Sequence, residues 1–232
     1  VAVAVAVAVG DGDRLPVAEW RILGYPPGRL QSPAAIHAGE DGRIWIADAW
    51  PRIQGFETDG RPALQHVIPE PAVDMLVAAD GSVIVGENRR LVRIRADGTV
   101  TGTVRLAAGT TQFWLTAMAR GSDPGTVRIL DSATLAVREY ATAGPMFPLT
   151  PTQLATDPWR LYWDLAERPG DPAYLVNRSA GTIEVLVSGS MAATWSVDGR
   201  CIRAATATGG SVFAPTLDGR GWERSPAGEM AA

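Results

Sequence analysis

Short runs of apolar and β-branched residues, separated by tight polar turns, dominate the first half of the chain. Between residues 32 and 67 there are four such runs, at 34–38, 43–47, 52–56 and 62–67. An Asp-Gly pair between β-branched and aromatic runs predicts a β-hairpin, because glycine takes a positive φ without steric penalty. Residues 32–67 therefore predict a four-stranded antiparallel meander, which needs packed neighbours because alone it buries neither of its faces.

The same pattern returns at a fixed interval. The Asp-Gly turn at 41–42 recurs 39 residues later at 80–81, and the one at 59–60 recurs 38 residues later at 97–98. Two turns that recur together at nearly the same spacing indicate an internal repeat. The second repeat predicts strands at 73–77, 82–86, 91–95 and 99–106.

Two further repeats are less regular. The third has an expected inner strand at 113–119 and expected outer strands at 126–130 and 137–140, with no clear second strand. A proline-rich connection spans 144–158. The fourth repeat predicts strands at 160–165, 173–176, 182–187 and 192–197, and two runs at 202–207 and 211–214 resemble the opening half of a fifth.

The chain ends suggest how the repeats are arranged. Residues 1–9 and 15–23 flank an Asp-Gly-Asp turn in the manner of a third and fourth strand, so we expect 1–24 to pair with 198–232 and close a ring without exposed sheet edges. The predicted fold class is all-β, a single closed β-propeller over residues 1–232. Five blades are discernible, whereas 232 residues divided by the repeat length gives about six.

One stretch resembles a known family. The NHL repeat resembles a segment of this chain that contains GRIWIAD at 42–48, RIQGF at 52–56 and the Asp-Gly turn at 59–60. Ser32-Pro33 before this segment also resembles the repeat, although Ala35 stands where that family usually has glycine. The second repeat matches the NHL pattern in outline, and the other repeats match it only in the spacing of their predicted strands. The resemblance implies a propeller, commonly of six blades. It also implies a protein-binding or RNA-binding platform, with lyases and lactonases among related propellers.

Composition narrows these possibilities. The net charge of −4, with arginine as the only basic residue besides two histidines, gives no electrostatic footprint for nucleic acid or an anionic membrane. Cys201 is the single cysteine, so neither an intrachain disulfide nor a cysteine metal cluster is expected. His37 and His66 alone support a zinc site poorly, and no metal or cofactor is expected. The apolar start, residues 1–9, is too short to span a bilayer and predicts a strand.

The inner strands supply one set of candidate residues. His37, Asp74 and Asp164 lie on predicted inner strands, where they would line a central funnel capable of acid–base work or ion binding. Such residues also serve to solvate a channel or to bind neighbouring backbone, which is the preferred interpretation.

The loops that follow the second strands supply another set. Asp48, Glu87 and Asn177 recur at the strand ends, where short polar side chains cap backbone N–H groups. Trp50, Arg89, Arg90 and Arg178 follow them and have the aromatic-plus-arginine composition of binding hot spots. Trp20, Trp45, Trp114, Trp163 and Trp195 fall within predicted strands, so packing between blades accounts for them.

These observations favour a noncatalytic protein-binding or scaffold module, an accessory or structural subunit of a larger assembly whose partners are other protein subunits. A first alternative is a propeller enzyme of the lyase or lactonase type that uses the funnel around His37. A second is a lectin-like carbohydrate binder.

Overall fold

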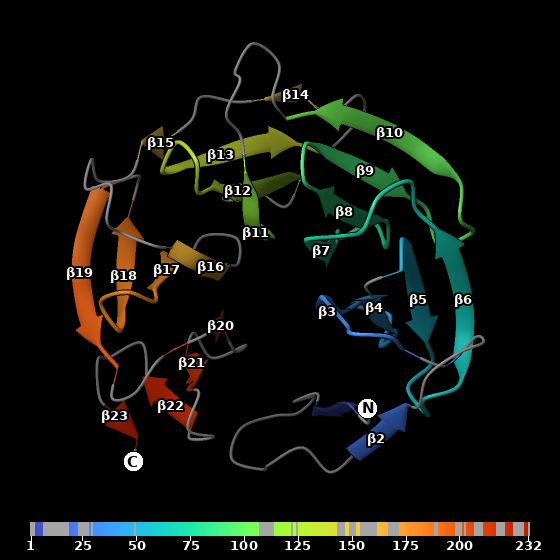
Figure 1. Cartoon of the computed structure of the whole chain (residues 1–232), viewed down its shortest axis with the longest axis horizontal. Helices are drawn as coiled ribbons and strands as arrows, with labels where there is room; N and C mark the ends of the chain where they lie inside the picture. The colour runs from blue at the N-terminus through green and yellow to red at the C-terminus, as the bar shows by residue number, and fades with distance from the viewer. Residues whose placement is uncertain are drawn as a thin grey trace. The chain divides into compact units, whose positions relative to one another are not determined.

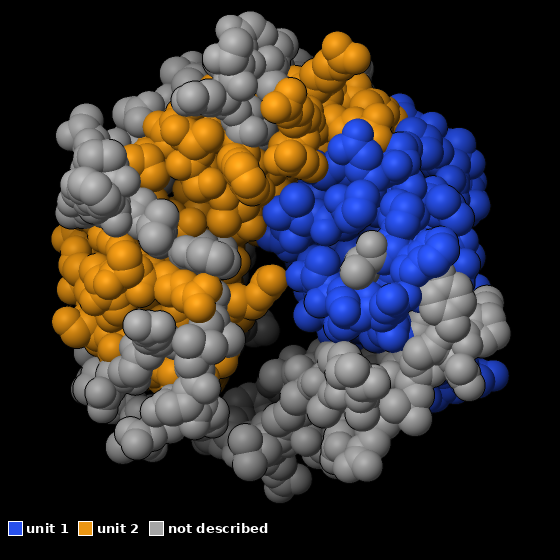
Figure 2. All heavy atoms as spheres, viewed as in Figure 1, with its two compact units in different colours: residues 1–87, 91–101 blue, residues 88–90, 102–232 orange. Residues whose placement is uncertain are grey.

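The structure is a computed structural model. It describes residues 3–6, 19–22, 28, 30–48, 50–106, 114–121, 123, 125–142, 147–148, 152–153, 162–166, 172–187, 190–197, 201, 203–206, 211–216, 221–224 and 230–231. These residues form antiparallel β-sheets and contain no helix (Figure 1). The chain divides into two compact units, which Figure 2 colours separately. Unit 1 is Val1–Glu87 with Leu91–Thr101, and unit 2 is Asn88–Arg90 with Gly102–Ala232.

The first two repeats fold as the sequence predicts. Each forms a four-stranded antiparallel sheet, and the observed strands agree with the expected ones to within one or two residues. The first sheet consists of β3 (Ala35–Ala38), β4 (Ile44–Asp48), β5 (Arg52–Phe56) and β6 (Pro62–Val67). The second consists of β7 (Asp74–Val77), β8 (Val83–Glu87), β9 (Arg90–Ile94) and β10 (Val100–Arg105).

Turn chemistry and burial explain why these segments pair. The glycines of the four Asp-Gly turns all have φ between 77° and 89°, the region that glycine adopts without strain. Strands β4 and β5 are buried along their whole length, whereas β6 alternates between exposed and half-buried positions. The middle strands are therefore covered on both faces, and the outer strand has one face in solvent.

The third repeat corrects the expected strand order. Thr126–Asp131 (β12) pairs with both Leu115–Arg120 (β11) and Ala136–Ala141 (β13), so the segment expected to be an outer strand is the second strand. The fourth position is taken by β14 (Phe147–Pro148) and β15 (Thr152–Gln153), which come from the proline-rich connection and both pair with β13. The prediction failed because this repeat has no Asp-Gly turn between its first two strands.

The fourth repeat is confirmed, and a fifth sheet follows it. The fourth sheet contains β16 (Tyr162–Ala166), β17 (Ala173–Asn177), β18 (Thr182–Val187) and β19 (Ser190–Ser196). The fifth contains β20 (Ala205–Thr206), β21 (Val212–Pro215), β22 (Gly221–Arg224) and β23 (Met230–Ala231).

The C-terminal segment thus supplies four strands of its own. Near the other end of the chain, β1 (Val3–Ala6) pairs with β2 (Glu19–Ile22) in a separate two-stranded sheet. The described residues therefore form five sheets of four or more strands, not the six blades that the resemblance implies. The pairing of 1–24 with 198–232 stays a prediction.

Apolar side chains fill the space between neighbouring sheets within each unit. In unit 1, one cluster joins Trp45 and Ile53 of the first sheet to Met75, Val85 and Val92 of the second. In unit 2, one cluster joins the third sheet to the fourth, and another joins the fourth to the fifth. Within each unit, neighbouring sheets therefore bury apolar faces against each other, as a repeat architecture requires.

Candidate functional site

In the first four sheets, a buried polar side chain ends the second strand and forms hydrogen bonds. Asp48 is 0% exposed, and its carboxylate accepts hydrogen bonds from the backbone N–H groups of Trp50 at 3.0 Å and Gln31 at 3.4 Å. Glu87 accepts one from the N–H of Glu70 at 3.1 Å. The contact with Trp50 confirms the predicted capping role for Asp48, whereas Glu87 holds the segment before β7. A buried carboxylate needs such donors to offset the loss of water.

Polar side chains at the ends of second strands accept hydrogen bonds in unit 2 as well. Asn177 accepts hydrogen bonds from the Ser179 hydroxyl at 2.8 Å and from the Ala180 N–H at 3.2 Å. Asp131, which sequence reasoning missed, accepts from the N–H groups of Trp114 at 3.0 Å and Ala133 at 3.1 Å. The signal was present, because Asp131 directly follows the apolar run 126–130 as Asp48 follows 43–47.

A buried ion pair reinforces this arrangement in the first sheet. The Arg52 guanidinium donates to one oxygen of Asp48 from Nε at 2.9 Å and from Nη2 at 2.6 Å, and both side chains are at most 5% exposed. The Gln54 side chain donates to the same oxygen at 3.4 Å. Asp48 thus links the turn that carries Trp50 to strand β5 through charge-assisted hydrogen bonds, which are the strongest type.

Trp50 projects from this fixed base. Its side chain is 51% exposed, and Val67 at the end of β6 is 80% exposed. The two segments are joined because the N–H of Ile68 donates to the carbonyl of Pro51 at 2.7 Å. We call this surface of unit 1, formed by Trp50, Pro51 and Val67, the Trp50 edge.

The other tryptophans are placed differently from one another. Trp45 is buried between sheets, as predicted, and Trp195 is half-buried against the core between the fourth and fifth sheets. The prediction for Trp114 was wrong. It precedes β11 and is 63% exposed, and its backbone N–H donates to Asp131. The side chains of Trp20 and Trp163 lie outside the described part of the structure.

The three arginines predicted to accompany Trp50 belong to the other unit. Arg89 is exposed in the turn between β8 and β9, while Arg90 begins β9 and is half-buried. Arg178 is half-buried just after β17. Trp50 lies in unit 1, so a common surface of these four residues stays a prediction.

The predicted funnel residues have structural contacts. Asp164 is buried on β16, and its carboxylate accepts the N–H of Ala204 at 2.7 Å, tying the fourth sheet to the segment before β20. Asp74 is buried on β7 and accepts the N–H of Met75 at 2.9 Å. His37 is half-buried on β3 opposite Trp45. His37 and Asp74 lie in unit 1 and Asp164 in unit 2, so a shared catalytic role stays a prediction.

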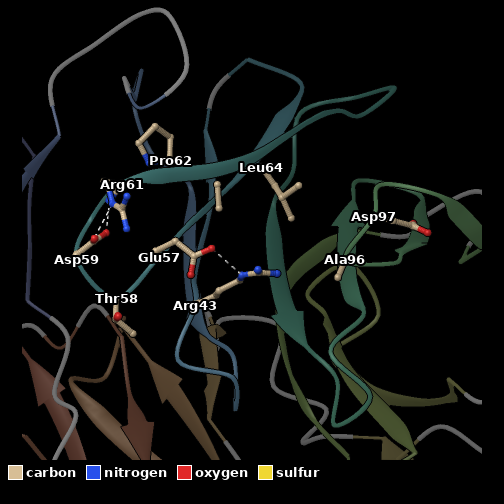
Figure 3. A pocket seen from close by; sticks show the side chains of 10 residues that line it. Arg43, Glu57, Thr58, Asp59, Arg61, Pro62, Leu64, Ala96 and Asp97 are labelled. Carbon is tan, nitrogen blue, oxygen red and sulfur yellow. Dashed lines mark hydrogen bonds and ion pairs between the residues drawn. The ribbon is translucent and has the colours of Figure 1, made fainter.

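An open groove of about 800 Å³ crosses the surface of unit 1. Figure 3 shows its walls, which come from the β5–β6 turn, from Arg43 before β4, and from Ala96 and Asp97 in the β9–β10 turn. Arg43 pairs with Glu57 at 3.3 Å. The exposed Arg61 pairs with Asp59 at 2.6 Å.

Hydrogen bonds stabilise the charged form of two aspartates in this groove, Asp59 and Asp97. The Arg61 N–H and then its guanidinium lower the pKa of Asp59, and the Thr99 N–H lowers the pKa of Asp97. Sequence reasoning did not identify this groove, because its walls come from turns almost 40 residues apart.

The described residues contain neither a metal-binding cluster nor a membrane-spanning helix. They contain no group of three or more histidine, cysteine or acidic side chains that could hold a metal ion. Within the same residues, no helix has the length and apolar character needed to cross a membrane.

Comparison with known proteins identifies the fold. No protein-family model matches the sequence, and no curated protein matches it. Among solved structures, a catalytically inactive histidine-to-alanine variant of virginiamycin B lyase from Staphylococcus aureus with quinupristin superposes with a TM-score of 0.68 at 12% identity. The match covers 86% of this chain and 69% of that one. The fold is a β-propeller.

Two more solved structures agree with this fold. Selenomethionine-substituted virginiamycin B lyase from the same organism has a TM-score of 0.66 at 14% identity, over 87% of this chain and 69% of the lyase. A protein of unknown function from Bacteroides caccae has a TM-score of 0.63 at 14% identity, over 93% of this chain and 84% of that one. The resemblance to the NHL repeat is not confirmed by these comparisons.

Proposed function

We propose that this propeller is a noncatalytic binding module that recognises another protein through the Trp50 edge, as an accessory or structural subunit of a larger assembly. The observation that carries the proposal is a half-exposed tryptophan fixed on a buried ion pair. Tryptophan is enriched among the few residues that dominate binding energy. A turn that is already held in place loses little conformational freedom on binding.

The exposed area sets the size of the expected effect. A tryptophan side chain buries roughly 150–250 Å² in an interface, so the half of Trp50 that is exposed offers about 100 Å². At about 25 cal/mol per Å² this corresponds to about 2.5 kcal/mol of binding free energy. Trp50→Ala should therefore weaken partner binding by about 60-fold.

The test is capture of the partner from the native source. The protein should purify at low salt as a particle heavier than its own 24.5 kDa, and Trp50→Ala should release the attached polypeptides. Phe213→Ala is the matched control, because Phe213 is another aromatic residue, 41% exposed and in the other unit. A monomeric native particle, or equal retention by the wild type and Trp50→Ala, contradicts the proposal.

A second candidate function is enzymatic, of the lyase type. It is supported by the similarity to virginiamycin B lyase, one structure of which is a variant inactivated at a histidine, and by His37 on the first strand of its sheet. Incubation with quinupristin, followed by mass spectrometry of the antibiotic, tests it directly. Turnover that is lost in His37→Ala supports the enzyme, whereas an unchanged antibiotic removes this candidate.

A further inference from the structure

Three aromatic side chains meet between the fourth and fifth sheets of unit 2. The ring of Trp195 on β19 lies 5.5 Å from that of Tyr174 on β17 and 6.0 Å from that of Trp222 on β22, with tilted planes in both pairs. Such offset, tilted arrangements are favoured by aromatic quadrupoles. The cluster is continuous with the apolar core between these sheets, so the position of the Trp195 ring is well determined by packing.

An arginine lies on this cluster. Arg224 Cζ is 4.5 Å from the centre of the Trp195 ring, a distance typical of cation–π contacts. Trp222 and Arg224 are two residues apart on β22, so both side chains project from the same face of the strand. Glu223 lies between them and projects from the opposite face, where it does not neutralise the guanidinium.

The hydrogen bonding of Arg224 differs from that of other half-buried arginines in this unit. Arg128 pairs with Glu139 at 3.2 Å, and Arg138 pairs with Asp131 at 3.3 Å. In contrast, the Nε–H of Arg224 is buried without a hydrogen-bond acceptor. No carboxylate pairs with this side chain among the residues that the structure describes. An unsatisfied group of this kind in a folded protein calls for a physical explanation, and a ligand is one.

We propose that Arg224, held flat on Trp195, is a binding site for a carboxylate. The guanidinium is planar and permanently charged, and its N–H groups match the two oxygens of a carboxylate in a bidentate geometry. The Trp195 ring restricts its rotation, which lowers the entropy lost when an acid binds. The carboxylate comes either from a free small acid or from an acidic side chain of a partner protein. The site is independent of the Trp50 edge.

Side-chain NMR of the whole, arginine-labelled protein can test this. Acetate is titrated against chloride at constant ionic strength while the Nε–H resonances are recorded, and Arg224→Lys identifies the Arg224 signal by its loss. The expected result is a saturable shift of this signal as acetate is added. The signal of Arg128, which is already paired, should not move. Absence of a saturable shift overturns the proposal.

Variants separate the site from general charge effects. The acetate-dependent part of the tryptophan fluorescence that is absent in Trp195→Phe should report binding, and Arg224→Gln should weaken binding at least tenfold. Arg128→Gln, which removes the same charge in the same unit, should bind as the wild type does. Equal binding by both variants overturns the proposal, provided that circular dichroism shows both to be folded. A glutamate-containing peptide that binds more tightly than acetate identifies a protein-borne carboxylate, and equal affinity identifies a free acid.

Discussion

Replacing Asp48 by asparagine removes the negative charge that neutralises the buried guanidinium of Arg52. In the native structure one Asp48 oxygen accepts two hydrogen bonds from Arg52, at 2.9 and 2.6 Å, and the two side chains are 0% and 5% exposed. The neutral amide of Asp48→Asn leaves a charged group in the interior with no counter-charge. It also weakens the hydrogen bond to the N–H of Trp50, so the base of the Trp50 edge is lost together with stability.

The expected magnitude follows from burial. Removing one partner of a buried ion pair destabilises a protein by about 3–5 kcal/mol. For a chain of this length, one kcal/mol lowers the melting temperature by about 2–4 °C, so the variant should melt roughly 10 °C below the wild type. Urea unfolding followed by circular dichroism and tryptophan fluorescence measures the change in the free energy of unfolding.

Two comparisons make this prediction specific. Arg61→Met breaks the Asp59–Arg61 pair, which has the same 2.6 Å separation but an arginine that is 79% exposed, and it should leave the free energy of unfolding close to that of the wild type. The double variant Asp48→Leu with Arg52→Met removes both charges. It should be more stable than the sum of its single variants by about 2 kcal/mol. A loss below about 1 kcal/mol in Asp48→Asn would refute the argument that burial makes this pair strong.

Three further outcomes are expected. Gly98→Ala should lose about 2 kcal/mol more stability in urea than Gly81→Ala. Both glycines have positive φ, but an added Cβ would clash with the His66 ring at position 98, whereas it would lie in open space at position 81. Equal losses would contradict the clash. Burial lowers the pKa of His66. Stability should therefore be constant above about pH 6.5 and fall below it, because the unfolded chain takes up the proton first. His66→Gln should remove this pH dependence from urea curves recorded between about pH 5 and 8, and an unchanged profile would exclude His66 as its source. Burial raises the pKa of Cys201 to about 11. A thiol reagent at about pH 8 should therefore label Cys201 only after the protein unfolds. Rapid labelling of the native protein would contradict the burial of this thiol.

The strands of the first two repeats could be predicted from sequence because their turns are encoded locally. Asp-Gly pairs at fixed spacing determine where each strand ends, and the φ of these glycines is positive as expected. The capping role of Asp48 was predictable for the same reason, since its acceptor geometry involves the backbone two residues away. In the third repeat the first turn carries no such pair, and the order of its strands was predicted incorrectly.

Other features depend on segments that are distant in the sequence. The backbone N–H of Trp114 donates to Asp131, 17 residues away, and the stacking of Arg224 on Trp195 joins two sheets. Strand alternation predicts which side of a sheet a residue faces, but not which neighbouring sheet covers that side. The sequence alone therefore determined the repeat and its turns. Only the tertiary structure decided which tryptophans are exposed and which arginines lack an acidic partner, because burial and pairing depend on packing between sheets.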